Sequence, residues 1–550
     1  MNWASILRFK CGGVVLALAL IVAIPVGYVA AGEMQPGFDR VVALTDTGPV
    51  VGLRTKTMNK FLGIPYAAPP VGALRWQPPQ PRVGWHGLRD ATQFANHCPQ
   101  VASPFGLAST TEDCLYLNVY TPTEHEYWYD GDRHGYPVMV WIHGGALVVG
   151  ESNDYDPSKL VDRGVVVVTF NYRLGFLGFL AHLALSAETK YGGSGDYGFM
   201  DQQAALDWVR RNIKHFGGNP DSVTIFGESA GGLSAHTQLA SPEAAGLFHR
   251  AIVESGAYFL NTTSLIDAEA AGAQLATAVG CGQTTATAAC LRSVPVATLL
   301  ANQPANLTGN VDGKVLTQPI HTALQTGQFN HVPVMEGSNH DEWRLFVGLD
   351  FELPPPFATG VATNTTNYPA RADASFSGAL SALGILNYVV SVLYPPSPLT
   401  PPGPSIALGA VGTDGIFACN SRTAIRQMAN FVPVFAYEFN DENAPELYLP
   451  PDTVSGMPYG AAHASELQYI FNLPQSPLNP LNANQKQLSR DMVSYWTNFA
   501  RFSNPNSFFT PFWPHYDPTK DQFQSFIPPQ PTTESTFATD HKCAFWAPGS

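Results

Sequence analysis

The sequence predicts an α/β protein with a large central, mostly parallel β-sheet flanked by helices. Continuous apolar, β-branched runs at residues 136–142 and 164–172 suit strands that are buried on both faces of a parallel sheet. Residues 201–216 then read as an amphipathic helix, and residues 222–226 as a further short strand. This alternation of strand, helix and strand is typical of an open sheet with both faces covered.

The N-terminal residues 1–31 are predicted to be a secretory signal peptide. Arg8 and Lys10 precede a long apolar stretch that ends in Val-Ala-Ala, as signal peptidase substrates do. An uncleaved membrane anchor is the alternative, because the apolar stretch is almost long enough to cross a bilayer. Cleavage would leave residues 32–550 as a single exported domain that is extracellular, periplasmic or displayed at the cell surface.

The charge balance argues against binding to nucleic acid. The chain carries a net charge of −14, and loss of Arg8 and Lys10 with the leader would leave 27 basic against 43 acidic residues, or −16. Such a surface repels phosphate backbones. The expected partner is a small molecule, with membrane contact only if the leader stays attached, and the oligomeric state is left open.

Six of the seven cysteines lie outside the leader: Cys98, Cys114, Cys281, Cys290, Cys419 and Cys543. An even number in an exported chain indicates disulfides, although six cysteines allow 15 pairings and the count does not choose among them. Pairing between sequence neighbours would close two short loops and one long loop. Free buried thiols are the alternative.

The strongest local motif is Gly-Glu-Ser-Ala-Gly at residues 227–231, which has the form G-x-S-x-G. It follows a predicted strand and precedes a predicted helix, residues 230–239, which is the context that a nucleophilic serine requires. The flanking glycines leave room at a sharp strand-to-helix turn. Ser229 is therefore the predicted nucleophile.

A serine hydroxyl needs a base, and the base needs a partner that fixes its tautomer. His463 lies among small residues late in the chain, which leaves its ring uncrowded; an ordinary loop histidine is the alternative interpretation. Glu342 follows an apolar run where a parallel sheet places its site loops. From the residues alone, Asp341 competes for the acid role and His340 for the base.

The order Ser229, Glu342, His463 matches the nucleophile–acid–histidine order of α/β-hydrolases. An oxyanion hole is also required, formed by backbone amides that point at the developing negative charge. Residues 141–146 end a strand with two glycines and an alanine. We expect the amides of Gly145, Ala146 and Ala230 to form this hole.

No metal or organic cofactor is expected. Residues 124–134 contain several metal-ligand types, but their spacing fits neither an EF-hand nor H-E-x-x-H, and a solvated loop explains them. His463 and Glu466 could be a metal pair, but the sequence suggests no third ligand.

Taken together, the motifs resemble the type-B carboxylesterases, a family with the α/β-hydrolase fold that includes cholinesterases and some fungal lipases. The resemblance covers about residues 40–546. The segments that carry it lie at residues 61–67, 112–119, 171–178, 201–206, 226–232 and 543–546.

The resemblance implies Ser229, Glu342 and His463 as the catalytic triad, and so favours Glu342 over Asp341. It also implies the oxyanion hole proposed above and the three disulfides between sequence neighbours. The expected function is that of a secreted serine ester hydrolase. A lipase, a cholinesterase-like esterase and a non-catalytic adhesion or binding domain are the alternatives.

Two departures from the family pattern point to small or medium uncharged esters. Ala146 stands where the family usually has a third glycine, and its methyl group should narrow the acyl side. The loop between Cys98 and Cys114 has fifteen intervening residues. It carries no tryptophan for a quaternary ammonium, its only aromatic being Phe105, and it is too short to be a lipase lid.

Overall fold

The computed structural model describes residues 39–548, apart from residues 124–134, 283, 285, 305–306, 354–357, 451–452 and 475–478. The predicted signal peptide and the charge-rich segment 124–134 both fall outside the described residues. In the part of the chain that is described, no helix has the length and apolar character needed to cross a bilayer.

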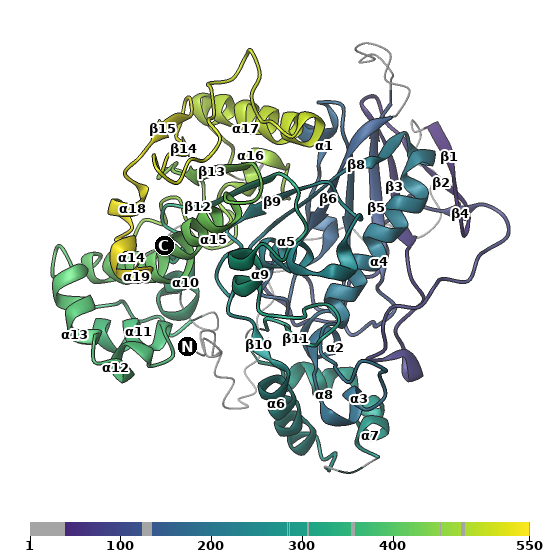
Figure 1. Ribbon diagram of the computed structural model, residues 1–550, viewed down its shortest axis with the longest axis horizontal. Helices are drawn as coiled ribbons and strands as arrows, with labels where there is room; N and C mark the ends of the chain where they lie inside the picture. Colours follow the sequence, from purple (N-terminus) through teal and green to yellow (C-terminus); the bar gives the residue numbers. More distant parts are fainter. Residues whose placement is uncertain are drawn as a thin grey trace, which may run out of the picture.

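A single sheet of thirteen strands forms the centre of the molecule (Figure 1). Its order is β1-β2-β3-β5-β7-β6-β8-β9-β12-β13-β14-β15, with β4 beside β2. Neighbouring strands from β1 to β7 run antiparallel, those from β7 to β14 run parallel, and β15 is antiparallel again. This confirms the predicted fold class, a mostly parallel sheet flanked by helices.

The strands are β1 (Asp39–Thr45), β2 (Gly48–Arg54), β3 (Met58–Pro65), β4 (Arg89–Asp90), β5 (Tyr116–Pro122), β6 (Tyr136–Ile142), β7 (Val166–Phe170), β8 (Gly218–Glu228), β9 (Arg250–Glu254), β10 (Thr263–Ser264), β11 (Asn310–Val311), β12 (Val334–Asn339), β13 (Val434–Phe439), β14 (Phe523–Phe526) and β15 (Thr532–Glu534).

The α-helices are α1 (Ser158–Val161), α2 (Gly175–Phe179), α3 (Leu183–Ser186), α4 (Tyr197–Asn212), α5 (Ala230–Ala240), α6 (Leu265–Ala278), α7 (Thr287–Ser293), α8 (Val296–Ala301), α9 (Ile320–Thr326), α10 (Arg344–Val347), α11 (Tyr368–Ser375), α12 (Ala379–Ala382), α13 (Leu386–Tyr388), α14 (Gly403–Gly412), α15 (Cys419–Met428), α16 (Leu467–Ile470), α17 (Ala483–Phe502), α18 (Phe537–Asp540) and α19 (Cys543–Trp546).

The central strands divide two hydrophobic cores. Successive side chains of β6 point to opposite faces: Val138 and Val140 join the core that includes residues of α4 and α5, whereas Met139 and Trp141 join the core that includes residues of α17. Because both faces are covered, the strand is apolar at every position, as the sequence analysis assumed.

The expected elements are present, with shifted ends. Strand β6 occupies the predicted residues, and β7 is shorter than expected. Helix α4 begins at Tyr197, four residues before the predicted start, and its last predicted turn is the 3-10 helix Ile213–Phe216. Strand β12 extends through Asn339, so the polar segment that was expected to follow this strand begins inside it.

Three disulfides join Cys98 to Cys114, Cys281 to Cys290 and Cys419 to Cys543. These are the pairings between sequence neighbours that the family resemblance implied.

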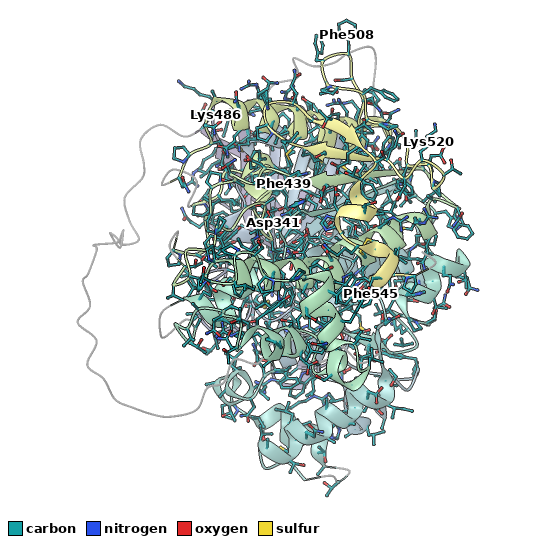
Figure 2. All side chains as sticks on the ribbon, turned by 90° about the vertical axis from the view of Figure 1, so that its left-hand side faces the viewer. Asp341, Phe439, Lys486, Phe508, Lys520 and Phe545 are labelled. Carbon is teal, nitrogen blue, oxygen red and sulfur yellow. A yellow bond between two sulfur atoms is a disulfide. The ribbon has the colours of Figure 1, made fainter. Side chains whose placement is uncertain are left out.

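A further hydrophobic cluster, outside the two sheet cores, is contributed mainly by residues from α10 to α14, which form a group at one side of the sheet (Figure 1). In Figure 2, Asp341 and Phe439 lie within the body of the molecule, whereas Phe508, Lys486 and Lys520 lie at its rim. Asp341 and Phe439 are buried, and Phe508 is 96% exposed. The loop after β12 therefore lies inside the fold.

Candidate active site

Ser229 occupies a sharp turn between β8 and α5, with φ +56° and ψ −120°. This positive φ is unfavourable for a residue with a side chain, and it is held in place because the Ser229 amide donates to the Glu254 carbonyl at 2.9 Å. A methyl group at Gly231 would lie 1.9 Å from the Ile142 carbonyl oxygen. The turn therefore packs directly against the end of β6. Ser229 lies at the centre of this turn and is half-buried.

His463 and Glu342 are in direct contact. His463 Nδ1 lies 2.5 Å from Glu342 Oε2, and since a carboxylate only accepts, Nδ1 carries the hydrogen. The other carboxylate oxygen, Oε1, accepts from the Asn339 amide at 2.7 Å. Both side chains are buried. The carboxylate therefore fixes the ring in the tautomer that leaves Nε2 free to accept a proton.

The two alternative residues from the sequence analysis have other partners. Asp341 is 2.8 Å from the Arg344 guanidinium and accepts from the Ala461 amide at 3.0 Å. His340 lies 3.3 Å from Asp341. The structure therefore brings Glu342, and not Asp341, to the His463 ring.

The opposite edge of the His463 ring faces the turn that holds the serine. Nε2 is 3.1 Å from Oε1 of Glu228, the residue before Ser229, and among the described residues Nε2 has no hydrogen-bond partner. The aromatic rings of Phe346 and Phe417 pack beside the imidazole, at centroid distances of 5.2 and 5.0 Å. The His463 ring therefore lies against the residue that precedes Ser229, but its Nε2 atom makes no hydrogen bond to the Ser229 hydroxyl. Such bonds often tighten only when substrate binds.

The segment after β6 passes close to the nucleophile. A methyl group at Gly144 would lie 3.2 Å from Ser229 Cβ. Gly145 and Ala146 follow with φ of +97° and +55°, a conformation that turns the backbone. Within the described chain, the amides of Gly145, Ala146 and Ala230 donate to no other group. Ala230 is the first residue of α5, where helix amides lack partners. Two of these amides therefore follow the glycine that packs against Ser229, and the third follows Ser229 directly in the chain.

Glu228 is an ionisable neighbour of His463 that the sequence analysis did not assign. Burial raises the pKa of Glu228, while His463 lowers it. Burial would by itself lower the pKa of His463, but the carboxylates of Glu228 and Glu342 raise it above the ordinary value. The pKa of each group is thus raised above its ordinary value. Only its position next to the motif serine could have drawn attention to this glutamate.

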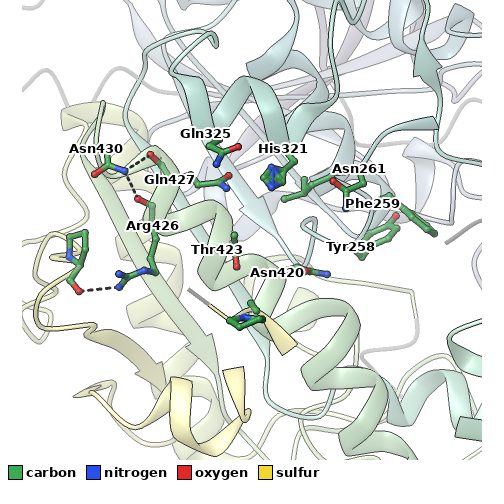
Figure 3. Close-up of a pocket in the computed structure, with 14 residues that line it drawn as sticks. Tyr258, Phe259, Asn261, His321, Gln325, Asn420, Thr423, Arg426, Gln427 and Asn430 are labelled. Atoms are coloured by element: carbon green, nitrogen blue, oxygen red, sulfur yellow. Dashed lines mark hydrogen bonds between the residues drawn. The ribbon is translucent and has the colours of Figure 1, made fainter. Parts of the chain in front are cut away.

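Tyr258 was also missed. Burial raises the pKa of its hydroxyl and the nearby Ser229 side chain lowers it, and its ring packs on Phe417 with centroids 5.2 Å apart. Tyr258 follows β9, and no motif marks it. It also lines one end of a pocket of about 570 Å³, whose lining mixes apolar residues such as Leu260 with polar ones that include His321 and Arg426 (Figure 3). Ser229 is not among the residues that line this pocket.

The loop between Cys98 and Cys114 is fixed to the segment that follows the strand β6. The Gln100 side chain donates to the Gly150 carbonyl at 3.0 Å and accepts from the Gly150 amide at 2.8 Å. Phe105, the loop's aromatic, packs on Tyr448 at 5.0 Å between centroids. Both rings border a small apolar cluster that includes Ala462, next to His463. An apolar wall therefore stands beside the candidate triad.

Comparison with known proteins agrees with this chemistry. A sequence model of the carboxylesterase family matches residues 39–546. Cocaine esterase of Homo sapiens is 34% identical, with 92% of this chain and 90% of that protein covered. Pyrethroid hydrolase Ces2e of Rattus norvegicus is 35% identical over 86% of this chain and 82% of its own. Fumonisin B1 esterase of Sphingopyxis macrogoltabida is 36% identical over 70% of this chain and 72% of its own.

Proposed function

The chain belongs to the carboxylesterase family and is a serine carboxylic ester hydrolase, and from that premise we propose that Ser229, His463 and Glu342 carry out the hydrolysis. The observation that carries this assignment is the 2.5 Å contact between His463 Nδ1 and Glu342 Oε2. It orients the ring so that Nε2 faces the turn at Ser229.

The reaction proceeds by two acyl transfers. His463 Nε2 takes the Ser229 proton as the oxygen attacks the ester carbonyl, and Glu342 stabilises the imidazolium. The amides of Gly145, Ala146 and Ala230 stabilise the negative oxygen of the tetrahedral intermediate. The imidazolium then protonates the leaving alcohol, and water releases the acid from Ser229 by the same route.

Small or medium uncharged esters are the proposed substrates. The apolar wall of Phe105, Tyr448 and Ala462 beside the triad favours an uncharged group, and the loop fixed by Gln100 leaves no long mobile cover for a lipid chain. The names of the relatives refer to pyrethroids, cocaine and fumonisin B1, which are chemically diverse. This diversity supports a broad esterase and not one specific for choline esters.

Export is proposed on separate grounds. Three disulfides suggest an oxidising compartment, and residues 1–31 have the composition of a cleaved signal peptide. N-terminal sequencing of the exported protein tests this: a mature chain that starts near residue 32 supports cleavage, and an intact leader contradicts it.

Covalent labelling tests the nucleophile. A fluorophosphonate should add once to the wild-type protein and to Ser494→Ala, a control that changes a serine of α17, and should not add to Ser229→Ala. Labelling of Ser229→Ala would overturn the assignment. A series of p-nitrophenyl esters, with butyrylcholine compared to its uncharged isostere, tests the substrate class: highest kcat/KM for long acyl chains or for choline would contradict it.

A further inference from the structure

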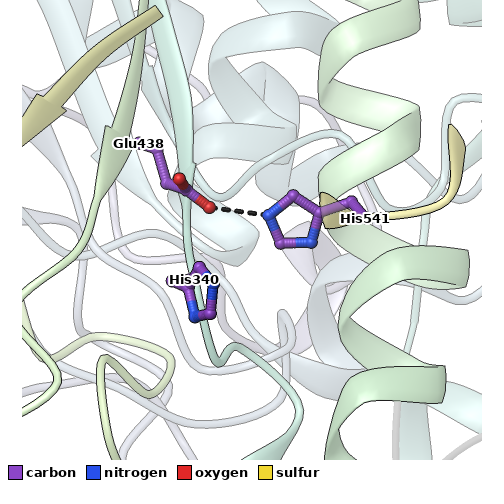
Figure 4. A group of neighbouring side chains, drawn as sticks. All are labelled: His340, Glu438 and His541. Carbon is purple, nitrogen blue, oxygen red and sulfur yellow. Dashed lines mark hydrogen bonds and ion pairs between the residues drawn. The ribbon is translucent and has the colours of Figure 1, made fainter. Parts of the chain in front are cut away.

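Three metal-ligand side chains from distant parts of the chain converge on one side of the sheet (Figure 4). His340 follows β12, Glu438 lies on β13, and His541 follows α18. One ligand atom from each lies within 4.8 Å of the others. Glu438 and His541 are buried, whereas the side chain of His340 is 32% exposed, so the group is open to solvent on one side.

Each of the two histidines has an aspartate near its Nδ1 atom, and His541 points its Nε2 atom at Glu438. His541 Nδ1 is 2.6 Å from Asp414 Oδ1, and His340 Nδ1 is 3.3 Å from Asp341 Oδ1. Metal-bound histidines usually make this contact through the nitrogen that does not bind the metal, because it fixes the tautomer and makes the ring a stronger ligand. His541 and Asp414 form such a pair here, and His340 has Asp341 near the corresponding nitrogen without a hydrogen bond to it.

Two further side chains of the group lie close to Glu438. His541 Nε2 lies 2.6 Å from Glu438 Oε1. A second acid, Glu534 at the end of β15, is a neighbour of Glu438, and burial together with that carboxylate raises the pKa of Glu534 to about 9. The Oε1 atom of Glu534 is buried and has no hydrogen-bond partner among the described residues. Lys542 and Arg344 lie against the outer carboxylates Asp414 and Asp341, and not against these two glutamates.

From these contacts we propose that His340, Glu438 and His541 bind one Zn²⁺ ion. Two imidazole nitrogens and a carboxylate oxygen are a zinc ligand set, and Glu534 or a water completes four-coordination. Tetrahedral zinc holds its ligand atoms about 3.3 Å apart. Binding therefore lengthens the contact between His541 and Glu438 and draws in His340, which is partly exposed and free to move inward.

The site is structural and separate from the reacting atoms. An ion here joins the loop after β12 to β13 and to the C-terminal segment that ends in α19. His340 is two residues before Glu342, but its ring faces Glu438 and His541 (Figure 4). Zinc would hold this loop without contacting Ser229 or the ester. The proposal therefore does not depend on the proposed catalytic roles.

Metal binding to the tag-free protein tests the proposal. After treatment with a chelator and dialysis, titration with Zn²⁺ should show one site per chain, and the metal should remain after further dialysis when measured by mass spectrometry. His340→Gln, at the half-exposed ligand, should weaken binding at least tenfold. His86→Gln, at an exposed histidine, is the control and should bind as the wild type does.

A second variant covers the buried ligands. His541→Gln could misfold, because the His541 ring lies between two carboxylates. Glu438→Gln keeps the shape of the side chain, and this variant should also bind Zn²⁺ at least tenfold more weakly.

Zn²⁺ should raise the melting temperature of wild type and His86→Gln but not of His340→Gln. Equal affinity in wild type and His340→Gln, or no stoichiometric zinc in the wild type, would overturn the proposal. If the zinc-free protein hydrolyses esters, the catalytic assignment stands whether or not the protein binds zinc.

Discussion

The imidazole of His463 lies between two carboxylates, and this position sets the pH dependence of the reaction. Its pKa is raised by Glu228 and Glu342 against the opposing effect of burial. The base works only when neutral, so the rate falls as the pH drops through this pKa. Because an unperturbed histidine titrates near pH 6.5, the acid limb of kcat/KM should lie above that value.

Glu228→Gln isolates the contribution of the carboxylate beside Nε2. The amide keeps the size of the side chain but removes the charge 3.1 Å from Nε2, so the pKa of His463 should fall. The acid limb of the pH profile of kcat/KM should therefore move to lower pH. Glu243→Gln, on the exposed 3-10 helix Pro242–Ala244, is the control. An unmoved acid limb in Glu228→Gln would mean that Glu228 is uncharged in the working enzyme.

Tyr258→Phe tests whether the tyrosine hydroxyl positions the nucleophile. Its contact with Phe417 keeps the ring in place, so the variant should fold normally. If the tyrosine hydroxyl beside Ser229 donates a hydrogen bond to it, loss of that bond should lower kcat/KM about two- to tenfold. The rate of fluorophosphonate labelling should fall by the same factor, because it reports the serine alone. An unchanged labelling rate would mean that the Tyr258 hydroxyl does not position Ser229 and that Tyr258 only lines the neighbouring pocket.

Among the elements, the turn between β8 and α5 depends on close backbone contact. A methyl group at Gly231 meets the Ile142 carbonyl oxygen, which is backbone and cannot turn away. Gly231→Ala should therefore lower the free energy of unfolding by about 1–3 kcal/mol and displace the serine, with loss of activity. Chemical unfolding curves measure the first effect. Gly282→Ala, with its nearest neighbour at 3.9 Å and no positive φ, should change neither stability nor activity.

Sequence patterns predicted the elements that are apolar throughout or tied to a motif. Strand β6 and helix α5 were found because one is a continuous buried run and the other follows the serine motif. The first turn of α4 was missed because it is a mixture of glycine and aromatic residues with weak helix propensity. It is helical because Tyr197 and Phe199 are fully buried there, so tertiary packing overrides local preference.

At the level of the whole molecule, the sheet gathers residues that the sequence separates. The parallel strands β6, β8 and β12 all end at one edge, so the placement of Ser229 and Glu342 at strand ends could be predicted from the apolar runs and the serine motif. Contacts between side chains that lie far apart in the sequence leave no such motif or strand-end pattern from which to predict them. Nothing local links Tyr258 to the serine, and Glu438 and His541 are 103 residues apart. Such sites need the fold to be known.

The C-terminal segment is held to this sheet by the disulfide between Cys419 and Cys543, which spans 124 residues, whereas the disulfide between Cys281 and Cys290 spans 9. In the chain-entropy description, a cross-link stabilises more when it closes a longer loop of the unfolded chain. Replacing both cysteines of the long loop by alanine should lower the free energy of unfolding by about 2–5 kcal/mol.

Replacing Cys281 and Cys290 of the short loop by alanine is the matched comparison. The resulting loss in the free energy of unfolding should be about 2 kcal/mol smaller than for the long loop. Denaturant unfolding of the two double variants under identical conditions measures the difference, and activity at low temperature checks that each variant has folded. Equal losses would mean that the long disulfide acts through its native contacts and not through the unfolded chain. The zinc affinity of the Cys419→Ala, Cys543→Ala protein then shows whether His541 keeps its place without the cross-link two residues away.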